Sequence, residues 1–515
     1  MACRLQSPPP PQPVNTMPIH AHPSASGRLE AALRRLDAAQ PALNALVADD
    51  RDAARADARR LDADSREGRP PPALAGRIAS VKDVLDLAGQ PSTWGLPSRK
   101  AHRAERDDDY VARLRRAGAL IVGKGNVSQL LLFHESDNPL FGRVNHPLSP
   151  DRTPGGSSGG EAALIAAGVT DLGLGTDLGG SVRVPAAWCG IAALMPTAGW
   201  LPEREQWGAP PGMGLLEDQV GILARSVADV AAVLGAVSPP RTRDGPPPPL
   251  ADWQRMDLAG RKVGYFLDDG VLPACPSARR AVEQAAQRLC DAGLCVEPWQ
   301  PPAPHEAVAL FNRYFSCDGG AWRRAALSDN PLDRRVRLIV GVTSLKRWQA
   351  KALAWTLRGL GQRALAAQLD GVGEHGGAAR ERCLQAIRDY RRRFADAMER
   401  DGIELILGPA TALPAYRHGD SYDLGVGVGV GGSYSVLYNL LGYPAGVVPV
   451  TTVRSDETRG HRAGLDLVRR AWVRTLRGGE GLPVGVQLAA RRWNDPLLLA
   501  AMARAEQNPD GADGP

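Results

Sequence analysis

Apolar and polar residues alternate along the chain in a pattern that predicts helices and strands in turn. Helical patterns cover residues 28–39, 42–64, 108–117, 162–167, 277–292 and 433–441, and most of residues 333–397. Short apolar runs at residues 78–81, 119–122, 262–266, 294–298, 403–407, 446–453 and 484–488 predict buried strands. Helices that alternate with buried strands are typical of α/β folds. One interrupted α/β domain is therefore the simplest prediction.

The two ends of the chain differ from this pattern. Residues 1–25 are rich in Pro, Ser and His and predict a tail without fixed structure. We expect the domain to span residues 26–506 and a second short tail to follow at residues 507–515. The N-terminus lacks the apolar segment of a secretory signal, and no run approaches the roughly 18 apolar residues of a spanning helix. These features predict a cytoplasmic protein and leave open a peripheral membrane contact and a homodimer.

The composition of the chain argues against nucleic-acid and metal partners. The formal net charge is +6, but only six of the 62 basic residues are lysines, which is typical of an arginine-rich genome. No clustered basic face or known module indicates a nucleic-acid partner. The seven cysteines show neither a CxxC pair nor a zinc spacing, so we expect buried free thiols and no metal.

Two glycine-rich segments carry the strongest chemical signal. Residues 153–161 read TPGGSSGGE and residues 173–185 read GLGTDLGGSVRVP, which places Ser157 and Ser181 24 positions apart. Residues without a Cβ let the backbone approach a reacting atom closely. Because Ser181 follows two glycines, several backbone N–H groups can point at one developing oxyanion. These segments indicate a hydrolase with a serine nucleophile.

A lysine completes this set. Lys82 lies in the apolar run ASVKDVLD, and a serine hydroxyl is a poor nucleophile until a base takes its proton. Burial between Val81 and Val84 would lower the pKa of Lys82, so the amine could serve as a neutral base. Ser157 could relay the proton, because a hydroxyl both donates and accepts. The alternative is a surface lysine paired with Asp83.

Two other motifs have simpler interpretations. Ser157 also lies at the centre of G-x-S-x-G, the nucleophile elbow of α/β-hydrolases, but residues 147–154 form a proline-bracketed loop where the elbow needs a strand. None of the nine histidines has a convincing acid–base context. Residues 427–432 match G-x-G-x-x-G without the strand and acidic residue of a dinucleotide site, so they predict a loop beside a pocket.

On these residues the chain resembles the amidase signature family over about residues 28–505. The resemblance implies that Ser181 is the nucleophile, that Ser157 bridges through a cis peptide bond and that Lys82 is the base. It also implies that the amides of Leu178, Gly179, Gly180 and Ser181 hold the oxyanion, that the sheet is mixed with helices on both sides, and that no metal or organic cofactor is needed.

Within the family, the chain is similar to the fatty acid amide hydrolase branch. This likeness lies in residues 136–142, in Glu161 and in residues 433–439 and 443–452, and by position it makes Leu131 a contact for the acyl group. The chain has a proline-rich tail where the animal enzymes have a transmembrane helix. The likeness implies cleavage of an amide with an apolar acyl group to acid and amine. Two alternatives stay open: an amidase for small or aryl amides, and the amidase-type component of a tRNA-dependent amidotransferase.

A helix predicted at residues 344–363 raises the question of a membrane surface. Leu345, Trp348, Ala352 and Trp355 share one face, and three basic residues lie beside it. Basic residues that flank tryptophans suit a helix in the headgroup layer. The alternative is an amphipathic helix that packs on the domain or in a dimer interface.

Overall fold

The computed structural model describes residues 24–201, 215–216, 218–242, 244–250, 252–423 and 432–506. The predicted C-terminal tail and nearly all of the predicted N-terminal tail lie outside these residues, as does most of the glycine-rich loop 427–432.

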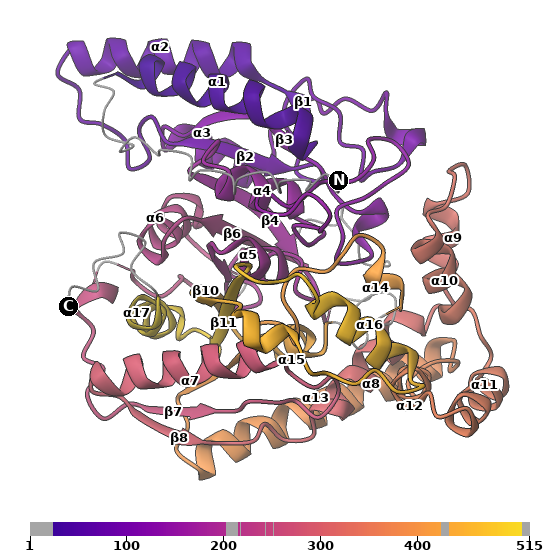
Figure 1. Cartoon of the computed structure of the whole chain (residues 1–515). Coiled ribbons are helices and arrows are strands. Elements are labelled where there is room, and N and C mark those ends of the chain that lie inside the picture. Colours follow the sequence, from indigo (N-terminus) through magenta and orange to yellow (C-terminus); the bar gives the residue numbers. More distant parts are fainter. Residues whose placement is uncertain are drawn as a thin grey trace, which may run out of the picture.

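Eleven strands of the described chain form one mixed sheet (Figure 1), in the order β1-β3-β2-β4-β6-β5-β10-β11-β9-β7-β8. Pairs β2–β3, β2–β4, β7–β8 and β7–β9 are parallel and the other six are antiparallel. The strands are β1 (Leu46–Asp49), β2 (Ile78–Lys82), β3 (Leu120–Gly125), β4 (Leu172–Asp177), β5 (Ala192–Met195), β6 (Gln219–Ala224), β7 (Lys262–Tyr265), β8 (Cys295–Pro298), β9 (Leu405–Pro409), β10 (Ala445–Thr452) and β11 (Pro483–Ala490).

Seventeen α-helices accompany the sheet in the described residues. They are α1 (Ala25–Leu43), α2 (Arg51–Arg66), α3 (Asp109–Arg116), α4 (Gly159–Ala166), α5 (Arg183–Cys189), α6 (Val227–Val237), α7 (Pro276–Asp291), α8 (Pro304–Ser316), α9 (Ala321–Ala326), α10 (Arg334–Thr343), α11 (Arg347–Gly359), α12 (Arg363–Gln368), α13 (Gly377–Arg400), α14 (Asp420–Asp423), α15 (Ser433–Leu441), α16 (Leu467–Leu476) and α17 (Asp495–Ala505). The mostly helical pattern predicted for residues 333–397 is confirmed by α10–α13.

Helices cover both faces of the sheet, because successive strand residues point to opposite sides. Ala193, Leu223 and Val447 pack in a cluster with α4 and α5. Their neighbours Leu194, Ile222 and Val448 belong to the larger core that also holds residues of α6, α7 and α17. The predicted α/β class with a mixed sheet between helices is therefore confirmed.

Close packing of α4 explains why strand β4 carries glycines. A Cβ on Gly173 would lie 3.0 Å from Glu161 Cβ, and one on Gly175 would lie 2.6 Å from Ser158 Oγ. Only residues without side chains let α4 and the loop before it lie this close to the sheet. The glycines thereby bring the Ser157 segment against the strand that leads to Ser181.

One predicted element is wrong. Residues 42–64 were expected to form a single helix, but β1 occupies 46–49 and α2 begins at Arg51. Asn44 at φ 52° ends α1, and Leu46 then pairs with Gly125 of β3 in an antiparallel register. Composition rich in Ala, Arg and Asp favours a helix locally, and this tertiary pairing overrides that preference. Strands β4–β6 and helices α5, α6, α8, α9, α14, α16 and α17 were not predicted.

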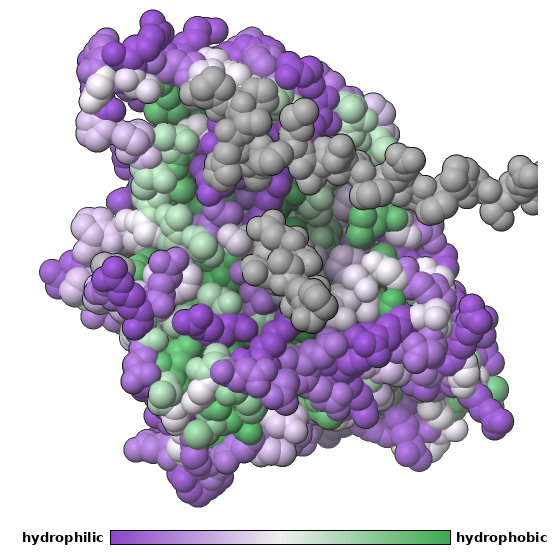
Figure 2. All heavy atoms as spheres, turned by 60° about the vertical axis from the view of Figure 1, so that its left-hand side comes forward, coloured by the Kyte–Doolittle hydropathy of each residue, from purple (hydrophilic) through white to green (hydrophobic). Residues whose placement is uncertain are grey.

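The end of the molecule formed by α1 and α2 is mostly hydrophilic (Figure 2). No helix in the described ranges combines the length and apolar character that spanning a bilayer requires. The six described cysteines are free, but Cys290 and Cys295 are exposed, which corrects the expectation that every thiol is buried.

Candidate active site

Lys82 ends the buried strand β2, and its side chain is fully enclosed. Its Nζ lies 2.8 Å from Ser157 Oγ, 3.0 Å from the carbonyl oxygen of Thr176 and 2.9 Å from Thr176 Oγ1. Burial lowers the pKa of Lys82 to about 8, against the opposing effect of nearby carboxyl groups. The predicted burial and the direction of the pKa shift are thus confirmed, and the surface-lysine alternative is wrong.

Ser157 precedes α4 in a segment of glycines that pack tightly on their neighbours. The Gly156–Ser157 peptide bond is cis, as the resemblance implies. A Cβ on Gly156 would lie 2.8 Å from Glu135 N and from the carbonyl oxygen of Phe133, so only glycine fits there. Residues 147–156 contain no strand, which removes the elbow interpretation.

Ser181 lies in the turn between β4 and α5, and Asp177 organises this turn. The Asp177 carboxylate accepts from Gly180 N at 2.7 Å and Val182 N at 3.1 Å, and it pairs with Arg183 at 2.9 Å. The Arg183 guanidinium and these amides hold the pKa of Asp177 far below its usual range, although burial alone would raise it. A permanently ionised Asp177 therefore fixes the turn that presents Ser181.

The backbone amides of this turn divide into two groups. Gly180 already donates to Asp177, whereas the amides of Leu178, Gly179 and Ser181 have no acceptor in the described part of the chain. Unsatisfied amides beside a reactive hydroxyl are the donors that an oxyanion needs. Three of the four expected amides are therefore available, and Gly180 serves the turn instead.

Ser157 and Ser181 both line one cavity of about 350 Å³. Their segments are joined by a hydrogen bond from Ser158 N to the carbonyl oxygen of Ser181, at 3.1 Å. Within the described residues, no hydrogen bond joins the two hydroxyl groups directly. The structure thus brings the two predicted serines to the same cavity and attaches one of them to Lys82.

Sequence reasoning missed the chemistry of two buried carboxyl groups near Lys82. Burial raises the pKa of Glu161 to about 7 and that of Asp218 to about 7, although the Lys82 charge lowers both. Neither Glu161 oxygen has a hydrogen-bond partner in the described structure, and the same holds for Oδ1 of Asp218. Asp218 immediately precedes the apolar strand β6. An acidic residue next to a buried strand was the one feature of the sequence that could have indicated a buried carboxyl group.

His134 is a further residue whose role the sequence did not reveal. Its buried ring lines the cavity, and Nε2 lies 3.2 Å from the carbonyl oxygen of Gly179. Burial lowers the pKa of His134 to about 4, so the ring is neutral at physiological pH and Nε2 donates to that carbonyl. The ring therefore supports the turn before Ser181.

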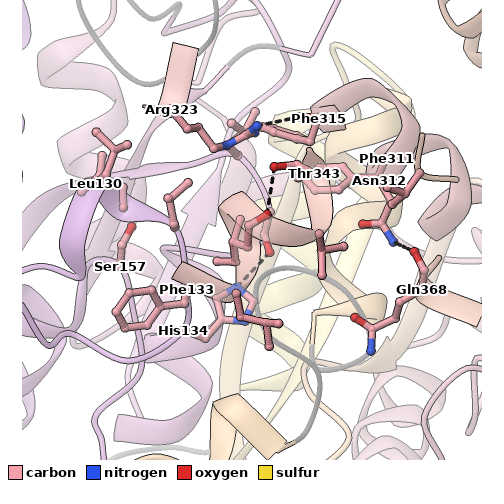
Figure 3. Close-up of a pocket in the computed structure, with 18 of the residues that line it drawn as sticks. Leu130, Phe133, His134, Ser157, Phe311, Asn312, Phe315, Arg323, Thr343 and Gln368 are labelled. Atoms are coloured by element: carbon pink, nitrogen blue, oxygen red, sulfur yellow. Dashed lines mark hydrogen bonds between the residues drawn. The ribbon is translucent and has the colours of Figure 1, made fainter. Parts of the chain in front are cut away.

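The rest of the cavity is predominantly apolar (Figure 3). Leu131 lines it, as expected for an acyl contact, together with its neighbours in residues 130–134 and with residues of α8, α10, α11 and α12. The apolar lining consists of Leu130, Leu131, Leu132, Phe133, Leu178, Phe311, Phe315, Leu338, Ile339, Val342, Leu353, Leu357, Leu365, Leu369 and Val372. Such a lining suits an extended hydrocarbon group. Across the described ranges, no cluster of three or more His, Cys, Asp or Glu residues could hold a metal ion.

Comparison with known proteins agrees with this geometry. The family model described as Amidase matches residues 28–499. Fatty acid amide hydrolase 1 of Caenorhabditis elegans is 32% identical over 445 residues, which cover 84% of this chain and 77% of that protein. A glutamyl-tRNA(Gln) amidotransferase subunit from Acidobacterium capsulatum is 30% identical over 501 residues, covering 94% and 97%.

A solved structure of fatty acid amide hydrolase superposes with a TM-score of 0.73 at 21% identity. It covers 94% of this chain, and 82% of its own chain is matched. At this identity the likeness concerns the fold.

Proposed function

Because the chain belongs to the amidase signature family, we propose that it hydrolyses amides with an apolar acyl group, using Ser181, Ser157 and Lys82. It is an amidase, an enzyme that acts on carbon–nitrogen bonds. The observation that carries the proposal is the buried contact of 2.8 Å between Lys82 Nζ and Ser157 Oγ, beside an apolar cavity that Ser181 also lines.

Neutral Lys82 is the base in this mechanism. Its amine takes the proton of Ser157, and Ser157 takes that of Ser181 as the Ser181 oxygen attacks the amide carbon. The two hydroxyls need to approach each other for this relay, which substrate binding can bring about. The lowered pKa of Lys82, about 8, makes the neutral form available near physiological pH.

The negative charge that forms on the carbonyl oxygen is received by the amides of Leu178, Gly179 and Ser181. As the carbon–nitrogen bond breaks, protonated Lys82 returns its proton through Ser157 to the leaving amine. Water then attacks the acyl-enzyme by the same relay and releases the acid. One amide and one water thus give one acid and one amine.

Two observations favour an apolar acyl group over small amides. Fifteen of the residues that line the cavity are Leu, Ile, Val or Phe. The fatty acid amide hydrolase of Caenorhabditis elegans, whose name states its substrate class, is 32% identical. The similarity to an amidotransferase component keeps ammonia transfer as the alternative, and that alternative predicts no hydrolysis of simple amides by the isolated chain.

Intact-protein mass spectrometry tests the proposal. The purified chain is incubated with alkyl fluorophosphonates of increasing chain length and, separately, with fatty acid amides. We expect one adduct on Ser181, faster labelling with longer chains, and release of the free acid from the amides. Ser80→Ala is the matched control, because Ser80 is a buried serine on the same strand as Lys82, and its hydroxyl has no hydrogen-bond partner in the described structure. Labelling without release of acid would overturn the proposal.

We also propose that this amidase contacts membrane surfaces reversibly. Seven of the eight large apolar residues exposed in the described chain lie between the start of α10 and the end of α12 or at or just before the start of α16: Leu338, Trp348, Leu353, Trp355, Leu360, Leu465 and Leu467. Trp348 is 68% and Trp355 78% exposed, while Leu353 of the same helix also lines the cavity. Exposed tryptophans beside a basic residue such as Lys351 suit a helix at the headgroup layer.

A further inference from the structure

One basic side chain with a full charge lines the cavity, on the side of α9 and away in sequence from the proposed catalytic residues, whereas the acid Asp218 lies beside Lys82. Arg323 of α9 is only 2% exposed, and Figure 3 shows it near the phenyl ring of Phe315. No other arginine and no lysine belongs to the described lining of the cavity. His134 is neutral near pH 7, because burial lowers its pKa to about 4. Arg323 therefore carries the single full positive charge in the described lining of the cavity.

The hydrogen-bonding capacity of Arg323 is largely unused. Nη1 donates to the carbonyl oxygen of Phe315 at 2.6 Å, and Nε is buried without a partner in the described structure. Asp318 Oδ1 lies 4.0 Å from Nη1, and its carboxylate already accepts from the amides of Gly320 and Trp322. A guanidinium has five N–H donors, so most of them remain for another group.

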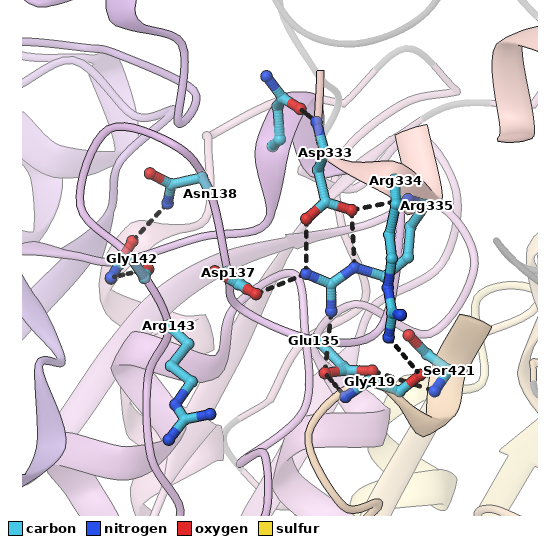
Figure 4. Close-up of polar contacts among 12 residues, drawn as sticks. Glu135, Asp137, Asn138, Gly142, Arg143, Asp333, Arg334, Arg335, Gly419 and Ser421 are labelled. Carbon is cyan, nitrogen blue, oxygen red and sulfur yellow. Dashed lines mark hydrogen bonds and ion pairs between the residues drawn. The ribbon is translucent and has the colours of Figure 1, made fainter. Parts of the chain in front are cut away.

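Two other buried arginines, Arg183 and Arg335, pair with carboxylates. A third, Arg152, also has an unpartnered Nε, but its two Nη atoms donate to three carbonyl oxygens, whereas Arg323 donates to one. Arg335 of α10 is 3% exposed and meets carboxylates of Glu135, Asp137 and Asp333 at 2.9, 2.5 and 2.8 Å (Figure 4). Arg183 pairs with Asp177 at 2.9 Å. Burying a charge without close counter-charge or hydrogen bonds is costly, so an arginine left in this state has a use for its free donors.

We propose that the cavity binds amide substrates that carry a carboxylate group, and that Arg323 pairs with this carboxylate. The inference rests on the proposed function and narrows its substrate class. A planar guanidinium matches the two oxygens of a carboxylate. Arg323 supplies one positive charge to a cavity of about 350 Å³ whose lining also holds the carboxyl group of Asp218, and this balance favours a monoanion over a phosphate dianion. The carboxylate sits either at the far end of the acyl chain or on the amine half.

Paired substrates of equal length distinguish these two positions. For the acyl half, the p-nitroanilide of an alkanoic acid is compared with the mono-p-nitroanilide of the matching alkanedioic acid. For the amine half, an N-acyl propylamine is compared with the N-acyl glycine of the same acyl chain. We expect wild-type kcat/KM to be higher for the anionic member of one pair, with the difference mainly in KM, since the charge is bound before chemistry begins.

Substitution assigns the effect to Arg323. Arg323→Met should lower kcat/KM for the preferred anion by about 10- to 100-fold, the range of a charge-assisted hydrogen bond, and leave its neutral partner unchanged or improved. Arg323→Lys keeps the charge and should retain part of the preference. Arg324→Gln is the matched control, because Arg324 is exposed on the same helix and bonds to Gly319 and Ser344 instead.

Equal kcat/KM for the charged and neutral members of both pairs in the wild-type enzyme would overturn the proposal without any variant. A second result would also overturn it: an Arg323→Met variant that loses kcat/KM equally for both members of the preferred pair, although it unfolds at the wild-type temperature and still reacts with a neutral fluorophosphonate. That result would make Arg323 a packing residue. Failure of the proposed function looks different: no substrate of either pair is cleaved and Ser181 is not labelled.

Discussion

Lys124 and Asp83 form a buried ion pair at 3.4 Å. Asp83 is the residue next to Lys82 in the sequence, and its carboxylate therefore pairs with Lys124 and not with Lys82. Asp83 also accepts a hydrogen bond from Thr93. Lys82 is consequently left with a serine, a threonine and a carbonyl oxygen as direct partners. An ammonium with neutral partners in a buried site loses its proton more readily than one paired with a carboxylate.

The rate of amide hydrolysis should follow the titration of Lys82. Burial lowers its pKa from 10.5 to about 8, and the base acts in its neutral form, so protonation below that pH removes activity. We expect kcat/KM to rise about tenfold per pH unit below this value and to level off above it. A pH–rate profile from pH 5.5 to 10 with a neutral substrate measures this. A flat rate between pH 5.5 and 7 would contradict Lys82 as the base.

Asp218 should influence the pH at which the rate rises, which is the ascending limb of the pH–rate profile. Its negative charge stabilises protonated Lys82, and removing it favours the neutral amine. Asp218→Asn should therefore shift the ascending limb of the pH–rate profile to lower pH. Glu161→Gln should shift it in the same direction by less, because the Asp218 charge has the larger effect on Lys82. A limb that stays in place in both variants would show that neither carboxyl group influences the base.

Replacing each of the three proposed catalytic residues should affect hydrolysis and covalent labelling differently. Ser181→Ala should abolish both hydrolysis and fluorophosphonate labelling, because the adduct forms on that oxygen. Ser157→Ala and Lys82→Ala should each reduce kcat by about 10²–10⁴-fold, the usual contribution of general-base catalysis. Mass spectrometry of labelled peptides locates the adduct. Labelling that survives Ser181→Ala but not Ser157→Ala would return the nucleophile to Ser157.

The sequence predicts the local parts of this site well. Apolar flanks predict that Lys82 is buried, and the glycines around Ser157 and Ser181 predict turns that bring backbone close to a reacting atom. These inferences succeed because they depend on residues adjacent in the chain. The same reasoning finds most of the α/β pattern.

Distant contacts are what the sequence conceals. Asp218 reaches the site only because β6 pairs with β4, and His134 does so because its loop lies against Gly179. Arg323 stands 142 positions after Ser181, and only the packing of α9 on the cavity reveals it. Strand β1 is missed for the same reason, since its partner β3 lies about 75 residues away and outweighs local helix preference.

Arg335 should be a major determinant of stability, because it holds α10 to the loop that contains Glu135 and Asp137 (Figure 4). Arg335→Met leaves three carboxylates without their cation and should lower the free energy of unfolding by about 3–5 kcal/mol. Denaturant unfolding measures the change, and Arg337→Met, an exposed residue on the same helix, is the control. A loss of under about 1 kcal/mol, the range of a surface ion pair, would show that the cluster does not hold α10 in place.

Contact with membranes should depend on the two exposed tryptophans of α11. Trp348 and Trp355 project from the helix whose Ala350 and Ala354 are buried, so replacing them leaves the packed face intact. Arg347 and Arg358 are engaged with Glu374 and Asp370, at 3.8 and 2.7 Å, so Lys351 is the basic residue best placed to meet anionic lipids. Burial of two indole rings and one such charge supports reversible binding that weakens as salt rises.

Sedimentation with anionic liposomes at low salt measures this binding. We expect the wild-type protein to co-pellet and the double variant Trp348→Glu, Trp355→Glu to stay in the supernatant, with unchanged unfolding temperature and unchanged hydrolysis of a short, soluble amide. Leu148→Glu is the matched control, because Leu148 is 63% exposed but lies far along the chain from α10–α12. If the wild-type protein does not pellet, or the double variant pellets equally well, the tryptophans do not contact membranes. Helix α11 then serves only to line the cavity.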